Sequence, residues 1–301
     1  MPVNKRLIVL LGPTGVGKTG LGVALAKHLG TPVVSADSRQ FFREMKIGTA
    51  PPSAEELGAA PHYFIHDRSV TEDYNAGAYA ADALRLLDEL FSAHDDVLLV
   101  GGSGMYIDAV CDGFDELPDA DPALRQQLSE VFEAEGIEPL LRKLRELDPQ
   151  YYGQVDRNNH ARVIRALEVC LSAGQPYSEL RSGKRRERGF KVVRIGLDMP
   201  REELYERIDR RVDKMMSDGL LAEAEALYPC RDRAALRTVG YSELFDYMDG
   251  KSSLEEAVEL IKRNSRRYAK RQMTWFRRNV DTAWFSPDET DKIKEYLDGG
   301  V

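Results

Sequence analysis

The residues best suited to chemistry lie near the N-terminus, where the run from Gly12 to Thr19 reads GPTGVGKT. This run has the spacing of a phosphate-binding loop, and it stands between a strand-like apolar run and a helical pattern. Glycines allow successive backbone N–H groups to converge on an anion, while a lysine neutralises its charge and a threonine hydroxyl binds Mg²⁺. The predicted phosphate-binding residues are Gly12, Pro13, Thr14, Gly15, Val16, Gly17, Lys18 and Thr19. Thr19 is the expected Mg²⁺ ligand, and the motif alone leaves open whether ATP or another phosphate compound binds.

A second reactive group, Asp37, directly follows the apolar run from Val33 to Ala36. Ligands of open α/β sheets lie at the carboxyl ends of the strands, so Asp37 is expected to face the bound phosphate compound. Its carboxylate is suited to act as a general base or to support Mg²⁺ through a water. An Asx turn or a helix N-cap would use the same side chain, and the residues alone do not separate these roles.

The apolar run from Val97 to Val100 ends in Gly101, Gly102 and Ser103. Enzymes that hydrolyse nucleoside triphosphates usually carry an acidic residue at this place, where it holds the metal. The glycines predict instead that a bulky group approaches the backbone here, with the Ser103 hydroxyl free to donate to it. A tight connection between a strand and a helix would need the same glycines, and it is the alternative.

Four short apolar runs predict the sheet that positions these residues, at 7–11, 33–36, 97–100 and 192–197. Helix-period segments separate them, which is the layout of a parallel sheet covered by helices on both faces. The long gap between the third and fourth runs carries helical patterns instead of strands. We therefore expect the α/β fold class, with a P-loop NTPase-like parallel sheet core and a mainly helical insertion. The expected core comprises residues 1–113 and 189–301, and the expected insertion comprises residues 114–188.

A long C-terminal helix is predicted to start at Ser253, which can form a capping box with Glu256. The segment from Lys262 to Arg278 holds eight basic and no acidic residues, although the whole chain has a net charge of −8. Aromatic residues, among them Tyr268 and Trp275, lie between these charges. Basic and aromatic side chains together are suited to single-stranded or looped RNA. Long basic side chains also often only solvate a helix surface, which is the alternative.

The composition is that of a globular protein with a sizeable core, since 43% of the 301 residues are hydrophobic and 31% are charged. No run approaches the roughly 18 apolar residues of a membrane-spanning helix. Lys5 and Arg6 are followed by an apolar stretch of strand length only. We therefore expect no membrane anchor, no signal peptide and a cytoplasmic location. Cys111, Cys170 and Cys230 are odd in number and widely spaced, which argues against disulfides and against a zinc site.

Further motifs follow the phosphate-binding loop along the chain. They are Ser35 to Gln40 with Ile47 to Ala50, Gly101 to Tyr106, Arg162 to Glu168, Thr238 to Tyr241, and Ala269 to Arg277. Together with the loop, these motifs resemble the successive signatures of bacterial tRNA dimethylallyltransferases, also called tRNA isopentenyltransferases. The resemblance runs from about residue 6 to about residue 285, and the shared order of the motifs makes it specific.

The resemblance implies transfer of a dimethylallyl group from dimethylallyl diphosphate to N6 of the adenosine at tRNA position 37, beside the anticodon, with Mg²⁺ as the cofactor. The phosphate-binding loop would then hold a diphosphate leaving group, so no hydrolytic water is needed. Asp37 would accept the proton that leaves N6, while Lys18, Thr19 and Mg²⁺ neutralise charge on the departing diphosphate. Arg207 and Arg211, one turn apart on a predicted helix, would clamp the diphosphate, although arginines on exposed helix faces are common.

The resemblance also implies tRNA contacts, with the insertion gripping the anticodon stem-loop and the target base turned out of its stack. The implied tRNA-binding residues are Asp37, Ser38, Arg39, Gln40, Ser103, Arg125, Ala161, Arg162, Val163, Ile164, Arg165, Arg237, Gly240, Tyr241, Lys270, Arg271, Gln272, Thr274, Trp275 and Arg277. Ser103 replaces the family's usual threonine, and Ala161 stands where many relatives have glutamine, which removes an amide from a predicted RNA contact. The expected partners are tRNA and dimethylallyl diphosphate, and a monomer is the expected state.

Two other function classes fit parts of the sequence. A nucleoside or small-metabolite kinase would share the phosphate-binding loop, the α/β core and often an Asp after the second strand. The loop from Arg181 to Lys191, which holds six basic residues, would then be its lid. An RNA-binding protein with a merely regulatory phosphate site is the third class, and an intact Asp37 beside an intact loop argues against it.

Overall fold

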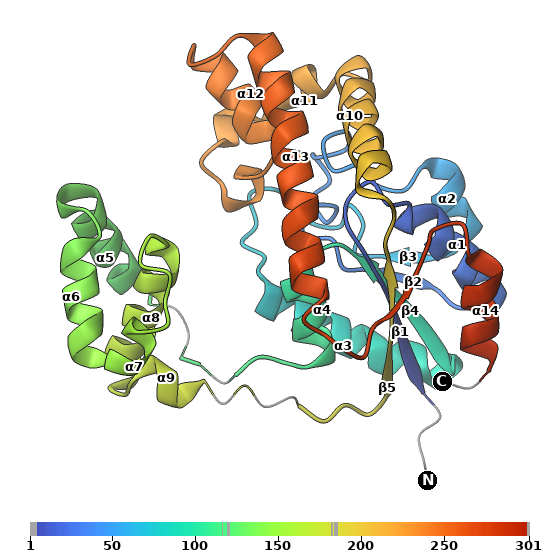
Figure 1. Cartoon of the computed structure of the whole chain (residues 1–301), viewed down its shortest axis with the longest axis horizontal. Coiled ribbons are helices and arrows are strands. Elements are labelled where there is room, and N and C mark those ends of the chain that lie inside the picture. The colour runs from blue at the N-terminus through green and yellow to red at the C-terminus, as the bar shows by residue number, and fades with distance from the viewer. Residues whose placement is uncertain (1–4, 116, 119–120, 182, 184–185, 300–301) are drawn as a thin grey trace. The chain divides into compact units, whose positions relative to one another are not determined.

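The computed structural model describes residues 5–115, 117–118, 121–181, 183 and 186–299, and these form two compact units (Figure 1). The core unit joins Met1–Cys111 to Glu187–Val301, and the insertion unit spans Asp112–Arg186. Each boundary lies two residues before the predicted one. Part of the basic loop predicted as a lid, at residues 182, 184 and 185, lies outside the described residues.

A six-stranded parallel sheet forms the centre of the core unit, in the order β3-β2-β4-β1-β5-β6. Its strands are β1 (Arg6–Leu11), β2 (Val33–Ser35), β3 (His62–Tyr63), β4 (Asp96–Gly101), β5 (Lys191–Leu197) and β6 (Ala283–Phe285). The four predicted apolar runs are β1, β2, β4 and β5, so the predicted α/β core is confirmed. The strands β3 and β6 were not predicted, because two or three residues at a sheet edge carry too little pattern.

Helices cover both faces of the sheet because side chains alternate along its strands. On β1, Leu7 and Val9 pack with residues of α3 and α4, while Ile8 and Leu10 pack with residues of α1, α10 and α14. The helices of the core unit are α1 (Lys18–Leu29), α2 (Ala54–Ala59), α3 (Ala76–Ala93), α4 (Gly104–Cys111), α10 (Arg201–Ser217), α11 (Leu220–Leu227), α12 (Tyr241–Met248), α13 (Leu254–Phe276) and α14 (Thr290–Asp298). The carboxyl ends of the central strands are thereby held firmly between two helical layers.

The predicted basic helix is α13, and its start is confirmed. The Ser253 hydroxyl accepts from the Glu256 backbone N–H, and the Glu256 carboxylate accepts from the Ser253 backbone N–H. This capping box satisfies backbone donors at the helix start. Ile261 and Ala269 are buried against the core unit, whereas Arg267 is exposed, so the helix turns an apolar face inward and a basic face outward.

The insertion unit is helical, as predicted, and has a core of its own. Its helices are α5 (Pro122–Glu135), α6 (Glu138–Leu147), α7 (Pro149–Tyr152), α8 (His160–Ala173) and α9 (Tyr177–Leu180). Leu144, Val163 and Ile164 are buried in that core. The prediction that Val163 and Ile164 contact tRNA is therefore wrong for their side chains, which pack inward because they fall on the apolar face of α8.

A buried carboxylate joins two helices of the insertion unit. Glu168 on α8 is 1% exposed, and it accepts hydrogen bonds from Arg125 Nε at 2.5 Å and Arg125 Nη2 at 2.7 Å. Arg165 Nη1 lies 3.4 Å from the same carboxylate. Arg125 was predicted to contact tRNA, and much of its hydrogen-bonding capacity serves this pair instead.

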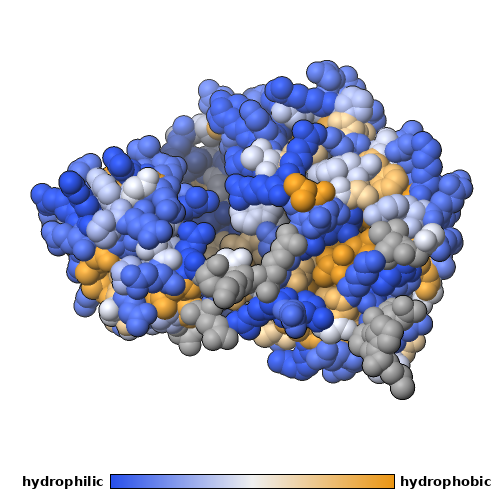
Figure 2. Space-filling view, turned by 60° about the horizontal axis from the view of Figure 1, so that its bottom comes forward, coloured by the Kyte–Doolittle hydropathy of each residue, from blue (hydrophilic) through white to orange (hydrophobic). Residues whose placement is uncertain are grey.

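No helix among the described residues combines the length and the apolar character needed to cross a membrane. Figure 2 shows a face that is mostly hydrophilic, with separate hydrophobic patches between the polar side chains. Charged residues make up 31% of the chain, which accounts for this appearance.

Arg125→Ala should destabilise the insertion unit by about 1–3 kcal/mol, because it leaves the buried Glu168 carboxylate with a weaker partner. This loss of stability is smaller than that expected for breaking a fully buried ion pair, because the Arg125 side chain is 51% exposed to solvent. Amide hydrogen exchange along α8 measures the loss locally. Arg142→Ala, on the exposed face of α6, should change stability by no more than about 0.5 kcal/mol. Equal exchange in the two variants would contradict the structural role of the pair.

Candidate functional site

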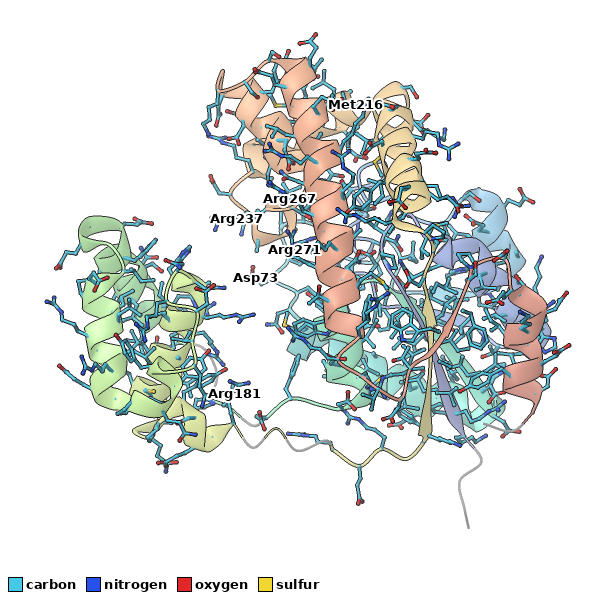
Figure 3. All side chains as sticks on the ribbon, viewed as in Figure 1. Asp73, Arg181, Met216, Arg237, Arg267 and Arg271 are labelled. Carbon is cyan, nitrogen blue, oxygen red and sulfur yellow. The ribbon has the colours of Figure 1, made fainter. Side chains whose placement is uncertain are left out.

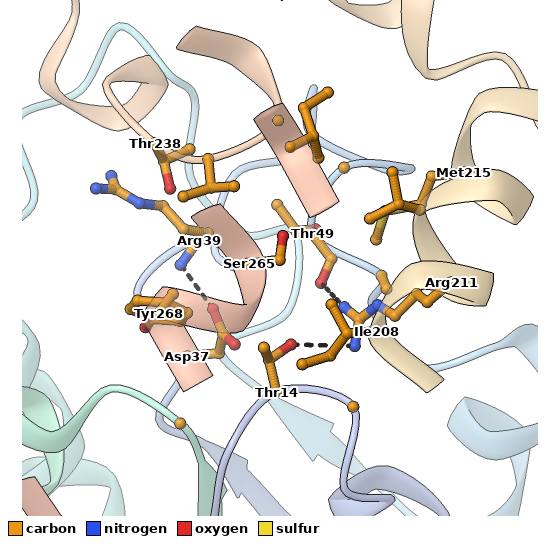
Figure 4. A pocket seen from close by; sticks show the side chains of 18 of the residues that line it. Thr14, Asp37, Arg39, Thr49, Ile208, Arg211, Met215, Thr238, Ser265 and Tyr268 are labelled. Atoms are coloured by element: carbon orange, nitrogen blue, oxygen red, sulfur yellow. Dashed lines mark hydrogen bonds between the residues drawn. The ribbon is translucent and has the colours of Figure 1, made fainter. Parts of the chain in front are cut away.

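A cavity of about 830 Å³ lies in the core unit at the carboxyl ends of β1 and β2 (Figure 4). Its walls come from the phosphate-binding loop, the 37–40 turn, the 48–50 loop, α10, the 238–240 loop and α13. Residues far apart in the sequence therefore meet around one space. Parallel strands with crossover helices place loops together in this way, and the site lies at the strand ends where Asp37 was expected to face it.

The phosphate-binding loop has the backbone that its glycines predict. Gly15 and Gly17 have φ angles of 84° and 107°, which side chains with a Cβ rarely adopt. Gly17 directly precedes α1, so Lys18 and Thr19 are the first two residues of that helix. The backbone N–H groups of the first turn have no partner within the helix, and this turn lies at the cavity. Lys18 Nζ donates to the carbonyls of Gly12 and Pro13 at 2.8 and 2.9 Å. The loop thus presents backbone donors and an ammonium group to an anion.

Burial lowers the pKa of Lys18 to about 8, an effect that the Asp37 carboxylate opposes and the Arg211 guanidinium reinforces. Burial also lowers the pKa of Arg211, again against the effect of Asp37. Two cations held in a poorly solvated space favour an anionic ligand, because such a ligand would restore the lost solvation.

Asp37 forms the Asx turn that was one of its possible roles. Its Oδ1 atom accepts from the Arg39 backbone N–H at 3.0 Å and more weakly from that of Gln40 at 3.4 Å, which is an Asx turn. Its Oδ2 atom makes no hydrogen bond to any residue within the described ranges, and Figure 4 shows the side chain at the cavity. One oxygen therefore orients the carboxylate, while the other is available to accept a proton.

The glycines at the end of β4 admit parts of the protein itself. A Cβ on Gly101 would lie 2.2 Å from the Ala36 carbonyl oxygen, and one on Gly102 would lie 2.5 Å from Gln272 Nε2. At Gly102 a bulky group does approach the backbone, as expected, and it is the protein's own Gln272 side chain. At Gly101 the close neighbour is the Ala36 backbone, which fits the alternative of a tight connection. Ser103 is buried, and its Oγ atom accepts from the Ser38 backbone N–H at 2.9 Å.

The two predicted diphosphate clamps, Arg207 and Arg211, both line the cavity from α10. Arg207 Nη1 donates to the Val16 carbonyl at 3.3 Å. Arg211 Nη1 lies 3.4 Å from Thr14 Oγ1, and its Nη2 lies 3.4 Å from the Thr49 carbonyl oxygen (Figure 4). These two long hydrogen bonds place the Arg211 guanidinium at the cavity, where it would meet an anionic ligand. The alternative of solvated surface arginines does not fit Arg211, whose pKa burial lowers, but it still fits Arg207, which is 40% exposed and pairs with Glu203 at 3.8 Å.

Gln272 was predicted to contact tRNA, but the structure places it inside. It is 6% exposed, its Oε1 accepts from the Thr14 backbone N–H at 2.9 Å, and its Nε2 donates to the Gly102 carbonyl at 2.7 Å. Both ends of the amide are thus used within the protein. Gln272 ties α13 to the phosphate-binding loop, and because it also lines the cavity, its contact with RNA stays a prediction.

Tyr241 is a second buried residue among the predicted tRNA contacts. Its ring is 0% exposed, and its hydroxyl donates to Glu223 at 2.6 Å. Gly240 is also buried, and it lines the cavity from the loop before α12. Tyr241 therefore serves packing, because the motif that contains it turns this side chain toward the core and not toward solvent.

The outer face of α13 carries predicted RNA contacts that are exposed. Arg267, Arg271 and Arg237 lie on one side of α13 in Figure 3, and Arg267 and Arg271 are four residues apart on the helix. The exposed Lys270 and Thr274 lie on the same helix. This face keeps the basic character that the sequence predicted.

Near the C-terminal end of α13, two predicted contacts already have partners. Trp275 Nε1 donates to Asp108 Oδ2 at 2.8 Å, and Arg277 Nη2 donates to Asp198 Oδ2 at 2.6 Å. Trp275 is half-buried against Gly104, whereas Arg277 is exposed. The alternative that Trp275 belongs to the packed interior is therefore partly right.

In the insertion unit, Ala161 and Arg162 are exposed at the start of α8. Arg165 is half-buried beside Glu168, and its Nη2 donates to the Pro118 carbonyl at 3.2 Å. Of the predicted contacts on α8, the first turn therefore offers the accessible surface.

Some cavity residues, among them Thr49 and Ile208, were not assigned a role from sequence. Tyr268, one of the aromatic residues expected to suit RNA, also lines the cavity, and burial raises its pKa to about 12. Thr49 stands in the motif from Ile47 to Ala50, and this motif could have indicated that Thr49 lies at the site. Ile208 lies between Arg207 and Arg211 in the sequence, and its place at the cavity could have been predicted from these two neighbours.

Comparison with known proteins connects this site to a family. A sequence model described as IPP transferase matches residues 40–279. The tRNA dimethylallyltransferase 1 of Phocaeicola vulgatus is 50% identical, with 97% of each chain covered. The tRNA dimethylallyltransferase 2 of Porphyromonas gingivalis is 53% identical, with 96% of each chain covered.

A solved structure agrees with these sequence matches. The full-length tRNA isopentenylpyrophosphate transferase of Bacillus halodurans superimposes with a TM-score of 0.73 at 39% identity. The match covers 98% of this chain and 96% of that one. By sequence over nearly its whole length, and by fold, this chain belongs to the IPP transferase family.

Proposed function

We propose that this protein transfers a dimethylallyl group from dimethylallyl diphosphate to N6 of the adenosine at tRNA position 37, giving N6-(dimethylallyl)adenosine. The observation that carries the proposal is the position of Asp37 Oδ2, which faces the same cavity as the phosphate-binding loop. A base for the acceptor and a cradle for the leaving group are thereby held in one space.

The chain is a tRNA-modifying prenyltransferase and not a small-molecule kinase. Its relatives with about half of all residues identical are named for dimethylallyl transfer to tRNA, and the similarity covers the whole chain. The shared phosphate-binding loop and α/β core, which suggested the kinase, are accounted for by a diphosphate leaving group.

The diphosphate would bind between the loop and α10. The N–H groups at the start of α1, the Lys18 ammonium and the Arg211 guanidinium converge on the cavity and would neutralise its charge. Binding would draw Lys18 Nζ away from the Gly12 and Pro13 carbonyls that it now contacts. As the bond between C1 of the donor and the bridging oxygen breaks, the electron pair stays with the diphosphate, where these donors stabilise it.

The acceptor would approach from the side of Asp37. The adenine N6 attacks C1 of the dimethylallyl group, forming the C–N bond, and Asp37 Oδ2 takes the proton that N6 loses. The adenine amino group is a weak nucleophile, so removal of this proton as the bond forms makes the step easier. The Asx turn through Oδ1 keeps the carboxylate oriented for this transfer.

The residues at the cavity fit a magnesium ion. The Thr19 hydroxyl and the Asp37 carboxylate both line the cavity, and Mg²⁺ prefers such oxygen ligands together with phosphate oxygens and waters. Thr19 would hold the ion directly, and Mg²⁺ when bound would supply charge neutralisation at the diphosphate.

Recognition of the tRNA anticodon stem-loop would fall to exposed basic residues. Arg237, Arg267 and Arg271 offer phosphate contacts on the core unit, and Arg162 offers one at the start of α8. The target adenine must leave its stack to reach Asp37 in the cavity. We expect the protein to act as a monomer in the cytoplasm, where its tRNA substrate is found.

The function is tested by incubating the purified protein and Mg²⁺ with labelled dimethylallyl diphosphate and unmodified tRNA. Label should be retained in the RNA, and replacing the adenosine at position 37 alone should abolish its retention. Absence of label, with ATP consumed in the presence of a nucleoside, would overturn the proposal in favour of a kinase.

Asp37→Asn should lower the turnover rate by about 10²- to 10⁴-fold, the usual contribution of a positioned base. The asparagine oxygen can still accept from the Arg39 and Gln40 backbone N–H groups, so the Asx turn is kept while proton acceptance is lost. Diphosphate and tRNA affinity should stay close to wild type, as measured by equilibrium binding. A variant with wild-type turnover would remove Asp37 from the mechanism.

Diphosphate binding should take up a proton at Lys18. The pKa of Lys18 is about 8 in the free protein, so the amine is about half neutral near that pH, and an adjacent anion favours its charged form. Affinity should therefore fall as the pH rises above about 8. Calorimetry near that pH, in buffers of different ionisation enthalpy, counts the protons. Lys18→Arg stays charged and should lack this uptake, whereas equal proton counts in both proteins would contradict the prediction.

A further inference from the structure

Glu223 on α11 makes an unusual set of hydrogen bonds with a loop far away in the sequence. Its Oε2 atom accepts from the backbone N–H groups of Lys46 and Ile47, both at 2.8 Å. Its Oε1 atom accepts from the Gly48 backbone N–H at 2.9 Å and from the Tyr241 hydroxyl at 2.6 Å. One carboxylate thus binds three consecutive N–H groups, and it fixes the path of the loop at residues 46–48.

The surroundings of the loop reinforce this path. A Cβ on Gly48 would lie 2.6 Å from the Tyr241 hydroxyl oxygen, so the ring of Tyr241 packs directly on the loop backbone. Burial and the Glu223 carboxylate both raise the pKa of Tyr241, so its hydroxyl remains a donor. The Thr49 hydroxyl donates to the Met45 carbonyl at 2.6 Å, which closes the loop on itself.

The next residues of the loop supply carbonyl groups to two side chains of the cavity. The Thr49 carbonyl lies 3.4 Å from Arg211 Nη2 and 3.3 Å from Gln40 Nε2, and the Ala50 carbonyl lies 3.2 Å from Gln40 Nε2. Figure 4 shows Arg211 pointing toward Thr49 across the cavity. A shift of the Thr49 carbonyl would therefore move or release the Arg211 guanidinium that it contacts.

We propose that Glu223 is a positioning residue for the donor, which acts by fixing the 46–50 loop so that the Thr49 carbonyl holds Arg211 over the diphosphate site. The proposal rests on the proposed function, since it takes Arg211 to bind the diphosphate of the donor. Glu223 does not line the cavity itself. Its influence on the donor passes through hydrogen bonds of the loop, and misplacement of a binding group by about 1 Å is enough to cost about 100-fold in rate.

A purely structural role for Glu223 makes a different prediction. Loss of such a role would lower stability without changing diphosphate affinity in the folded protein. Asp148 is a suitable control, since this buried carboxylate in the insertion unit accepts from the Tyr151 and Ser178 backbone N–H groups and from the Ser178 hydroxyl. Asp148→Ala should lose stability in a similar way but keep wild-type affinity for diphosphate.

The experiment measures the dissociation constant of inorganic diphosphate with Mg²⁺ for the wild type, Glu223→Ala, Glu223→Gln and Asp148→Ala. Glu223→Ala should weaken binding by roughly 10- to 100-fold and raise KM for the donor similarly, with a smaller effect on kcat. Glu223→Gln keeps the side-chain size and one acceptor oxygen, so it should fold well and bind with intermediate affinity. Tyr241→Phe leaves the three backbone contacts in place and should stay within about threefold of wild type.

A double-mutant cycle links the effect to Arg211. If Glu223 acts through Arg211, the double variant Glu223→Ala with Arg211→Lys should bind diphosphate hardly more weakly than Arg211→Lys alone. If the losses of diphosphate affinity caused by Glu223→Ala and Arg211→Lys multiply in the double variant, Glu223 does not act through Arg211. The role of Glu223 is also overturned if Glu223→Ala and Glu223→Gln bind diphosphate as well as Asp148→Ala does. Neither result affects prenyl transfer by the wild type. A wild type that binds no diphosphate and transfers no prenyl group would instead overturn the proposed function and this inference with it.

Discussion

The rest of the site depends on the desolvation of two cations beside one carboxylate. Lys18 and Arg211 face the same cavity as Asp37, and burial lowers the pKa of both cations. A site with this charge distribution gains from an anion that replaces lost water. In the proposed reaction that anion is the diphosphate of the donor, and the two cations would stabilise it as it leaves.

The fold holds this arrangement through connections between distant segments. Gln272 links helix α13 to Thr14 of the phosphate-binding loop and to Gly102 after β4. The same helix carries Arg267 and Arg271 on its outer face. The surface proposed to bind tRNA and the loop proposed to bind the donor are therefore joined directly within the core unit, which fits a reaction that brings both substrates together.

Local sequence was sufficient where a motif fixes its own backbone. The glycines of the phosphate-binding loop and the capping box at Ser253 depend on neighbouring residues, and both were predicted. The Asp37 turn is equally local, and it stood among the roles that the sequence left open. The two cores and their boundary were also predicted, to within two residues, because a change from strand to helix period marks them.

Side-chain direction was the part that sequence could not give. Gln272, Tyr241, Val163 and Ile164 stand in motifs shared with an RNA-modifying family, and they were assigned to RNA on that ground, yet all four are buried. A motif indicates that a position matters, but tertiary packing decides whether its side chain faces a substrate or the core. The contacts of Glu223 were hidden for the same reason, since they join segments about 175 residues apart.

The most direct test of the account is a crystal structure of the wild-type protein with Mg²⁺, inorganic diphosphate and an unmodified anticodon stem-loop RNA. The account predicts diphosphate within hydrogen-bond distance of Lys18 and Arg211, and the adenosine at position 37 unstacked with N6 at Asp37 Oδ2. Diphosphate bound away from these cations, or an adenosine whose N6 faces a residue other than Asp37, would contradict it.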